Sequence, residues 1–242
     1  MVKIRLVVVA FLSLVLTACG VPVSHVDWID LVQFNGIQYL AVGGYMGSYF
    51  EDANARGLVE ADLGPEFARV KNKLTATHLG VPQCCQDGDA AYLDKGTVVY
   101  IVKGYNPEFR LAAYRDGRLV LFEADTNPKA QTGADLLDIG GKVEYIGVNS
   151  AEDGVTELAA ITDPEQVAVL VELVLGSPVD QTHMTQVGIK YFIAFHLRDG
   201  TISIRAYSPD SGELSRGIML PEAFGITVEF AVSGMRAIPI TP

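Results

Sequence analysis

The sequence predicts an α+β protein in which hairpin-rich, mostly antiparallel sheets are joined by two main short helices. Three two-residue turn signals favour the sheets, because Asn35-Gly36, Asp116-Gly117 and Asp199-Gly200 each stand between apolar, β-branched or aromatic runs. Two further segments combine helix-start residues with helical spacing of apolar side chains. Several hairpins with few helices are typical of an antiparallel sheet that is covered on one face.

The first half of the chain is expected to contain five strands, one loop and one helix. The glycine- and aromatic-rich segment 43–50 is interpreted as the loop. The helix is predicted over 66–74, with Pro65 in its first turn, where a missing N–H group costs nothing. The expected strands cover 26–34, 37–42, 96–104, 109–114 and 118–123.

The second half follows a polar stretch over 125–133, which is the best candidate for a boundary between two subdomains. Its helix begins with a clear signal, since Thr162 or Asp163 can cap it and Pro164 suits its first turn. It is expected to end at Gly176. The expected strands cover 142–148, 156–161, 189–197, 201–207, 213–219 and 226–232, and a short helical turn is expected at Pro221.

The two halves look alike in outline. Each is expected to have a helix, a loop and then a hairpin closed by Arg-Asp-Gly, at 115–117 and 198–200. In both hairpins a phenylalanine lies six residues before the arginine. Two related αββ subdomains would explain this pattern, and so would chance, since Asp-Gly is a common hairpin turn.

Composition and charge exclude several functional classes. The chain has 242 residues, of which 49% are hydrophobic, so it can bury a core and is too apolar for a disordered protein. Its formal net charge of −11 argues against nucleic-acid partners, which need a basic footprint. The same charge argues against electrostatic docking on anionic lipid.

The first twenty residues carry the strongest functional signal. Lys3 and Arg5 precede Leu6–Leu16, an apolar run that is too short to span a bilayer and matches the core of an export signal. The run ends in Leu16-Thr17-Ala18-Cys19, which resembles the lipobox of bacterial lipoproteins. The resemblance implies cleavage before Cys19, a diacylglyceryl thioether on its sulfur and usually a further, palmitate-type acyl chain on the new amino terminus. Two or three acyl chains hold a protein stably on a membrane, whereas one does so marginally.

This resemblance sets the expected organisation and location. Residues 1–18 are expected to be the signal peptide and 19–25 a tether. A first α+β subdomain then covers 26–124, a linker 125–141 and a second subdomain 142–242. The protein is expected in the bacterial cell envelope, with acylated Cys19 in the lipid bilayer on the extracytoplasmic side.

Two adjacent cysteines, Cys84 and Cys85, remain once Cys19 is acylated. In an oxidising compartment they can form a strained disulfide with each other, stay as unpaired thiols, or serve as a thiolate site for a metal or redox partner. The neighbouring side chains supply neither a CxxC spacing nor a basic residue, so the third alternative has the least support.

Catalytic and cofactor motifs are absent from the sequence. It contains no GxGxxG, GxxxxGK[ST], HExxH or GxSxG pattern, and we expect no cofactor. His196 is expected at a surface or strand edge rather than as a ligand. Asp87-Gly88-Asp89 fits a solvated turn better than a calcium loop, because the further oxygen ligands of an EF-hand are missing.

One segment supports a binding hypothesis. Four aromatic residues alternate with Gly43, Gly44 and Gly47, and aromatic faces on flexible backbone are common at ligand and partner surfaces. The alternative is that these rings fill the core beneath a loop. The four residues are Tyr39, Tyr45, Tyr49 and Phe50.

Three hypotheses for function follow. The first is a lipid-anchored, non-catalytic binding or interaction domain, whose partner is an envelope protein or a small molecule. The second is an envelope hydrolase whose active site no motif reveals, and which a cleft with clustered, pKa-shifted side chains would favour. The third is a lipoprotein that handles thiols or metals through Cys84 and Cys85.

Overall fold

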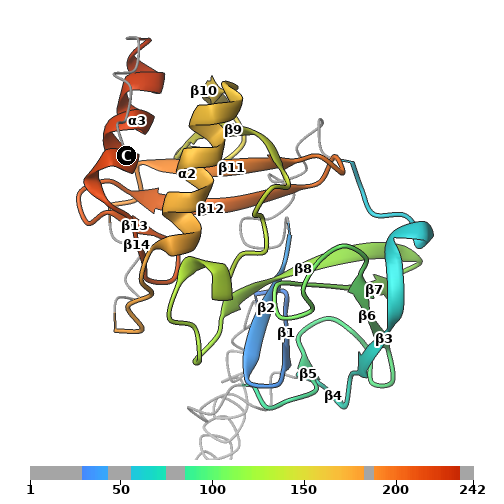
Figure 1. Ribbon diagram of the computed structural model, residues 1–242. Coiled ribbons are helices and arrows are strands. Elements are labelled where there is room, and N and C mark those ends of the chain that lie inside the picture. Colours follow the sequence, from blue (N-terminus) through green and yellow to red (C-terminus); the bar gives the residue numbers. More distant parts are fainter. Residues whose placement is uncertain (1–28, 43–55, 75–84, 183–187, 235–242) are drawn as a thin grey trace, which may run out of the picture.

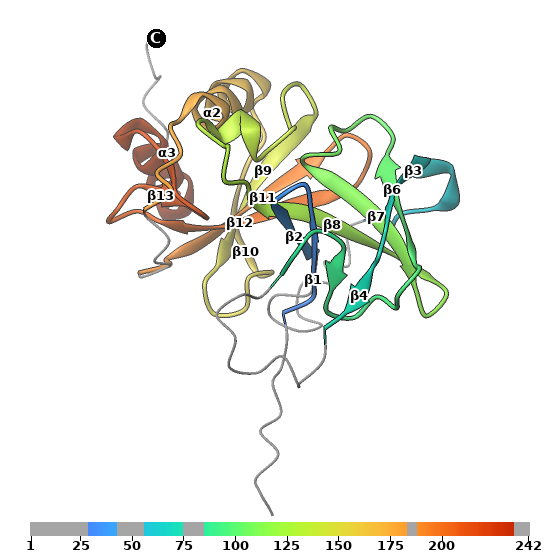
Figure 2. The ribbon, with the colours of Figure 1, turned by 90° about the horizontal axis from the view of Figure 1, so that it is seen from below.

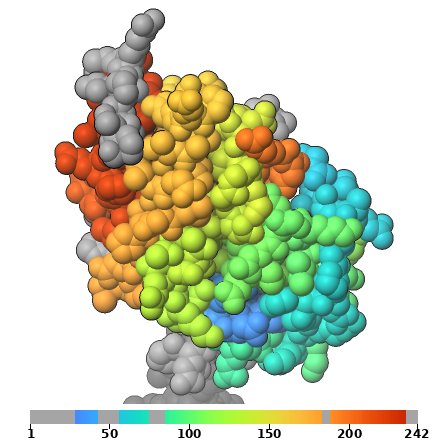
Figure 3. All heavy atoms as spheres, viewed as in Figure 1, coloured from blue at the N-terminus to red at the C-terminus, as the bar shows by residue number. Residues whose placement is uncertain are grey.

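The computed structural model describes residues 29–42, 56–74, 85–182 and 188–234, and it has the predicted α+β architecture. Two mainly antiparallel sheets lie next to each other, and the two α-helices of the described residues pack on the second (Figures 1 and 2). On the face seen in Figure 3, the segment that connects the sheets fills the space between helix α2 and sheet 1.

Sheet 1 is built from the first half of the chain. Its spatial order is β3-β6-β7-β8-β2-β1-β5-β4, and all neighbours are antiparallel except the parallel pair β4 and β5. Its strands are β1 (Leu31–Phe34), β2 (Ile37–Ala41), β3 (Leu63–Arg69), β4 (Asn72–Lys73), β5 (Asp89–Ala90), β6 (Val98–Val102), β7 (Arg110–Arg115) and β8 (Arg118–Thr126). Strand β8 is the longest of them and runs beneath sheet 2 (Figure 1).

Sheet 2 is built from the second half, in the order β10-β9-β11-β12-β13-β14. Its strands are β9 (Val143–Ser150), β10 (Glu157–Ile161), β11 (Tyr191–Leu197), β12 (Ile202–Ser208), β13 (Glu213–Leu214) and β14 (Ile218–Met219). The helices are α2 (Pro164–Gly176) and α3 (Glu222–Ser233), and two short 3-10 turns cover Glu60–Asp62 and Gly133–Asp135. Strand β11 is central and buried along its whole length.

The predicted turn and cap chemistry is confirmed at several sites. Asn35-Gly36 and Asp116-Gly117 all have positive φ, as a two-residue hairpin turn with matching twist requires. Helix α2 begins where expected, because the Asp163 side chain accepts a hydrogen bond from Gln166 N and Pro164 occupies the first helical position. The helix ends at Gly176, also as expected.

The two sheets have separate hydrophobic cores. Sheet 1 buries Val32, Tyr39, Leu111 and Phe122 among its own side chains. The second core lies between sheet 2 and the helices, and includes Val171 and other apolar residues of α2 and α3. The two halves are therefore not joined by one continuous apolar core. Polar side chains form much of the contact between them.

The prediction of a helix over 66–74 is wrong, because strands β3 and β4 lie in this segment. Strand β3 lies at the edge of sheet 1, where Pro65 can be accommodated despite its missing N–H group. Its pairing with β6 shifts register on either side of Glu66, which is typical of a bulged edge. Within the described residues of the first half, no α-helix precedes the hairpin of residues 110–126, whereas the apparent duplication of an αββ unit required one.

The strand predicted over 226–232 is also wrong, because these residues lie in α3. The helix buries Phe224, Thr227 and Val228 on one face and ends at Gly234 with a left-handed cap. Burial at helical spacing outweighs the strand preference of its β-branched residues.

Two further segments of sheet 2 also differ from the prediction. The strand predicted over 213–219 is a small hairpin of β13 and β14. The Asp199-Gly200 turn is a longer loop, in which Asp199 accepts a hydrogen bond from Thr201 N.

Gly133 provides a direct test of how the connecting segment packs on α2. It is buried, its N–H donates to Ser177 O at 2.9 Å, and an added Cβ would collide with the carbonyl oxygen of Val174. We expect Gly133→Ala to lower the free energy of unfolding by about 2–3 kcal/mol, because backbone must move to make room.

Gly176→Ala is the matched control for that variant. The space around a Cβ at Gly176 is open, so the same substitution should change stability by less than about 1 kcal/mol, in the stabilising direction. Urea unfolding of both variants measures the difference. Equal midpoints for the two variants would contradict the described packing.

Candidate functional site

The carboxylate of Glu123, on β8, is the centre of the contact between the two sheets. Its Oε1 accepts hydrogen bonds from Nε and Nη2 of Arg110, on β7 of the same sheet. Its Oε2 accepts from the hydroxyl of Ser203 at 2.7 Å and from Nη1 of Arg205 at 2.8 Å, both on β12 of sheet 2. Both oxygens are thus fully used by protein donors.

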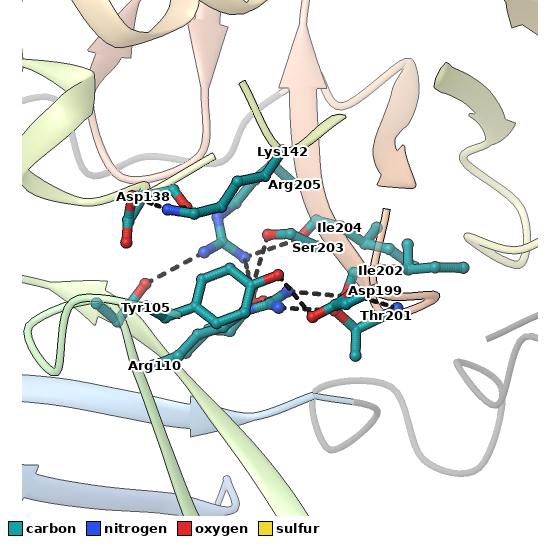
Figure 4. Close-up of polar contacts among 12 residues, drawn as sticks. Tyr105, Arg110, Asp138, Lys142, Asp199, Thr201, Ile202, Ser203, Ile204 and Arg205 are labelled. Atoms are coloured by element: carbon teal, nitrogen blue, oxygen red, sulfur yellow. Dashed lines mark hydrogen bonds and ion pairs between the residues drawn. The ribbon is translucent and has the colours of Figure 1, made fainter. Parts of the chain in front are cut away.

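Arg110 extends this contact toward the β11–β12 loop (Figure 4). Its side chain is completely buried, and its Nη1 donates to the hydroxyl of Thr201 at 2.7 Å. The guanidinium lies 4.5 Å from the ring centroid of Tyr105 and 4.9 Å from that of Phe109, within cation–π range. Tyr105 and Thr201 both donate to the carboxylate of Asp199.

The charges in this cluster are balanced. Burial raises the pKa of Glu123, but the nearby guanidinium groups of Arg110 and Arg205 and the Ser203 hydroxyl outweigh it, so the pKa lies below its ordinary value. Glu123 therefore stays ionised at neutral pH and has no unused lone pair for a substrate. The cluster joins the sheets and is not suited to general acid–base catalysis.

A cavity of about 240 Å³ lies beside this cluster, between β2 and β8 of sheet 1 and the facing side of sheet 2. Its walls are mostly apolar, and its volume suits a small molecule, since a cavity of about 150 Å³ holds a benzene ring. Its apolar lining includes Leu40, Ala41, Val42, Phe192, Ile204, Ala206 and Ile218. Such a cavity with few polar groups is the usual form of a small-molecule site.

The polar wall of the cavity includes Asp125 and Arg216, together with Glu123, Arg205 and Ser215. Nε of Arg216 donates to Oδ1 of Asp125 at 2.7 Å. Oδ2 of Asp125 is buried and accepts no hydrogen bond from any described residue. Within the same part of the chain, the two terminal nitrogens of Arg216 form no hydrogen bond. This ion pair therefore retains one acceptor and several donors for a ligand.

The turn between β13 and β14 presents Arg216 to the cavity. Ser215 and Arg216 both have positive φ, which residues other than glycine rarely adopt. The turn is held from two sides, since Gly217 N donates to the buried Glu213 and the Ser215 hydroxyl donates to Ala206 O. Strained backbone of this kind gathers at functional sites.

The aromatic binding surface that the sequence suggested is only partly described. Tyr39 is fully buried in the core of sheet 1, and its hydroxyl donates to Pro107 O at 3.0 Å. Burial, with the nearby Glu108 and Asp87 carboxylates, raises the pKa of this tyrosine. Tyr45, Tyr49 and Phe50 lie outside the described residues, so their role stays a prediction.

The cysteines have different outcomes. Cys19 and Cys84 lie outside the described residues. Cys85 is in a disulfide, and in that state its sulfur is not the thiolate that a metal requires. The amide of Gln38 lies 3.9 Å from this sulfur.

The prediction that His196 lies at a surface or strand edge is wrong. It is on the central strand β11, 8% exposed, and its ring stacks on Tyr145 with centroids 3.9 Å apart. Its Nε2 lies 4.0 Å from Oε2 of Glu157. The other three histidines, His25, His78 and His183, lie outside the described residues.

The Asp87-Gly88-Asp89 turn binds its own chain. Asp87 accepts from Gly36 N, and Asp89 is buried and accepts from Asn72 and Gln86. Among the described residues no group of three or more His, Cys, Asp or Glu side chains is placed to hold a metal ion. In the same residues no helix has the length and apolar character needed to cross a bilayer.

Comparison with known proteins adds no further assignment. No protein-family model, curated protein or solved structure matches this chain.

Sequence reasoning missed the cavity because its lining comes from segments far apart in the chain. One signal was present, since Glu123 and Arg205 interrupt strands that are otherwise largely apolar. Charged residues at such positions need partners when buried. The sequence does not show that each is the other's partner.

Replacement of Glu123 by glutamine tests its part in joining the sheets. The variant leaves Arg110 and Arg205 without a counter-charge, so we expect a loss of about 3–5 kcal/mol in the free energy of unfolding at pH 7. Glu66→Gln removes the exposed Arg69 pair and should cost less than about 1 kcal/mol.

The pH dependence gives a second readout of the same variant. Because the pKa of Glu123 in the folded protein lies below its ordinary value of 4.5, its ionised form adds stability at higher pH. That contribution is lost as the pH falls through the folded-state pKa. Urea unfolding between pH 3 and pH 7 should therefore give a flatter curve for Glu123→Gln than for wild type, and parallel curves would contradict this role.

Proposed function

We propose that this protein is a lipid-anchored lipoprotein of the bacterial cell envelope, whose two-sheet body binds a small, largely apolar molecule. The cavity between the sheets carries the second part of the proposal. It combines apolar walls with an ion pair that has unused hydrogen-bonding atoms, which is the composition expected of a specific small-molecule site. The lipobox at Leu16-Thr17-Ala18-Cys19 carries the first part.

Two observations favour binding over catalysis in this proposal. The most buried carboxylate beside the cavity, Glu123, is saturated with hydrogen bonds and ionised, so it is neither a proton donor nor a free base. Asp125 is paired with Arg216, and the hydroxyl of the lining residue Ser215 donates to Ala206 O. Among the described residues of the lining there is no histidine or cysteine to act as nucleophile or base.

Filling the cavity should weaken ligand binding. Ala206 lies on its wall and is 8% exposed, so Ala206→Phe places a ring in the cavity volume. We expect the apolar probe 1-N-phenylnaphthylamine to bind wild-type protein with an increase in its fluorescence. Its affinity for Ala206→Phe should be at least about tenfold lower.

Ala168→Phe is the matched control for cavity filling. Ala168 is exposed on α2, away from the cavity lining, so the probe should bind this variant as it binds wild type. Circular dichroism establishes that both variants are folded. Probe binding that is unchanged in folded Ala206→Phe would contradict a ligand site between the sheets.

Acylation can be tested separately in a bacterial host. Cys19→Ser should abolish incorporation of labelled palmitate and move the full-length chain out of the membrane fraction, because no thiol is left at the lipobox. Cys84→Ser and Cys85→Ser should keep the label. Label that persists in Cys19→Ser would contradict the proposed anchor.

A further inference from the structure

We propose that the cavity between the sheets selects a ligand whose polar end is an uncharged amide, bound by Asp125 and Arg216. This inference rests on the proposed binding function and adds the chemical class of the ligand. It follows from the atoms of the polar wall that no protein group uses and from the charge already present there.

The unused atoms comprise one buried acceptor and a set of donors. Oδ2 of Asp125 is buried without a hydrogen bond among the described residues, in a side chain that is only 13% exposed. A buried acceptor needs a donor, so a ligand N–H or O–H placed there supplies a hydrogen bond that no described residue supplies. The terminal nitrogens of Arg216 offer donors next to it, because only Nε is used by Asp125.

Charge balance disfavours an ionic ligand. Glu123 and Asp125 carry two negative charges on this wall, and Arg205 and Arg216 carry two positive charges. A ligand carboxylate would lie against the carboxylate of Asp125, and a ligand ammonium against the guanidinium of Arg216. Burial also raises the pKa of Asp125, which shows that the site already disfavours negative charge. An uncharged group avoids both penalties.

An amide matches the two kinds of unused atom. Its N–H donates to Oδ2 of Asp125, and its carbonyl accepts from a terminal nitrogen of Arg216. An ester of the same shape offers only the carbonyl, and therefore leaves the acceptor on Asp125 unpaired. Sites built to bind a ligand donor discriminate strongly against analogues that lack it.

The backbone at Arg216 supports a recognition role for its side chain. The residue has a φ of 56° and follows Ser215 with a φ of 21°, in a turn where glycine or asparagine would cost less. Its side chain is 21% exposed, and its guanidinium forms a single hydrogen bond among the described residues. The strain therefore places donors at the cavity and is not compensated by a set of internal hydrogen bonds.

Three probes with one apolar body test this inference. 4-Phenylbutanamide, methyl 4-phenylbutanoate and 4-phenylbutanoate differ only at the polar end, and their affinities for wild-type protein are measured by calorimetry at pH 7. We expect the amide to bind about tenfold more tightly than the ester, since it alone supplies the missing donor. The carboxylate should bind more weakly than the amide by at least the same factor.

Two variants assign the preference to the polar wall. Arg216→Gln should weaken amide and ester alike, because it removes the donor to the carbonyl that both ligands share. Asp125→Asn should bring the affinity for the amide close to that of the ester, because it removes the carboxylate acceptor of the amide N–H, and should strengthen carboxylate binding by removing the opposing charge. Arg69→Gln, at an exposed ion pair on β3, should leave all three affinities unchanged. Because Asp125 is largely buried, a misfolded Asp125→Asn would leave the more exposed Arg216→Gln as the decisive variant.

The outcomes separate this inference from the function on which it rests. If amide and ester bind equally and Ala206→Phe weakens both, the cavity binds ligands but does not select an amide. If the carboxylate binds most tightly, the site recognises anions and the inference is overturned. If none of the three probes binds folded wild-type protein and 1-N-phenylnaphthylamine also fails, the proposed binding function fails as well.

Discussion

The joining of the two sheets depends on one buried carboxylate. Glu123 belongs to sheet 1, and it binds an arginine of its own sheet together with an arginine and a serine of sheet 2. Burying charges normally costs more than their attraction returns, unless every lone pair finds a donor at good distance. In Glu123 every lone pair accepts a hydrogen bond, so the contact fixes one relative placement of β8 and β12. Apolar surfaces slide over one another more easily than a saturated hydrogen-bond set does.

The cavity is a consequence of that placement. The two hydrophobic cores are separate, although Phe109 of the first half packs in the second core, and the sheets also meet through polar side chains at Glu123 and at Asp125. The ion pairs of Glu123 and Asp125 lie between the sheets, beside the apolar residues of β2 and β12. Space remains beside them, with apolar walls from both halves of the chain. The same contact thus explains why the halves stay together and why they do not fuse into one core.

Local chemistry explains which parts of the fold were predictable. The hairpins at Asn35-Gly36 and Asp116-Gly117 and the start of α2 at Asp163 follow from backbone preferences of a few residues. The failures occur where position in the fold decides. Pro65 suits a helix start and an edge strand equally, and only the order of sheet 1 places it at an edge. The segment 226–232 has strand composition, yet it is a helix because burial on sheet 2 rewards its helical face. The polar wall could not be predicted for the same reason, since no local sequence pattern indicates that Asp125 and Arg216 form an ion pair.

The edges of the two sheets determine how this protein meets its own copies. Sheet 1 ends in β3, where Pro65 lacks a donor and the register shifts twice, and in β4, which has only two residues. Sheet 2 ends on one side in β14, which is equally short. An edge must offer a long, regular row of N–H and C=O groups to recruit a further strand, and these three edges do not. A neighbouring copy therefore finds no strand to extend at these three edges, and the surfaces there stay available for other encounters.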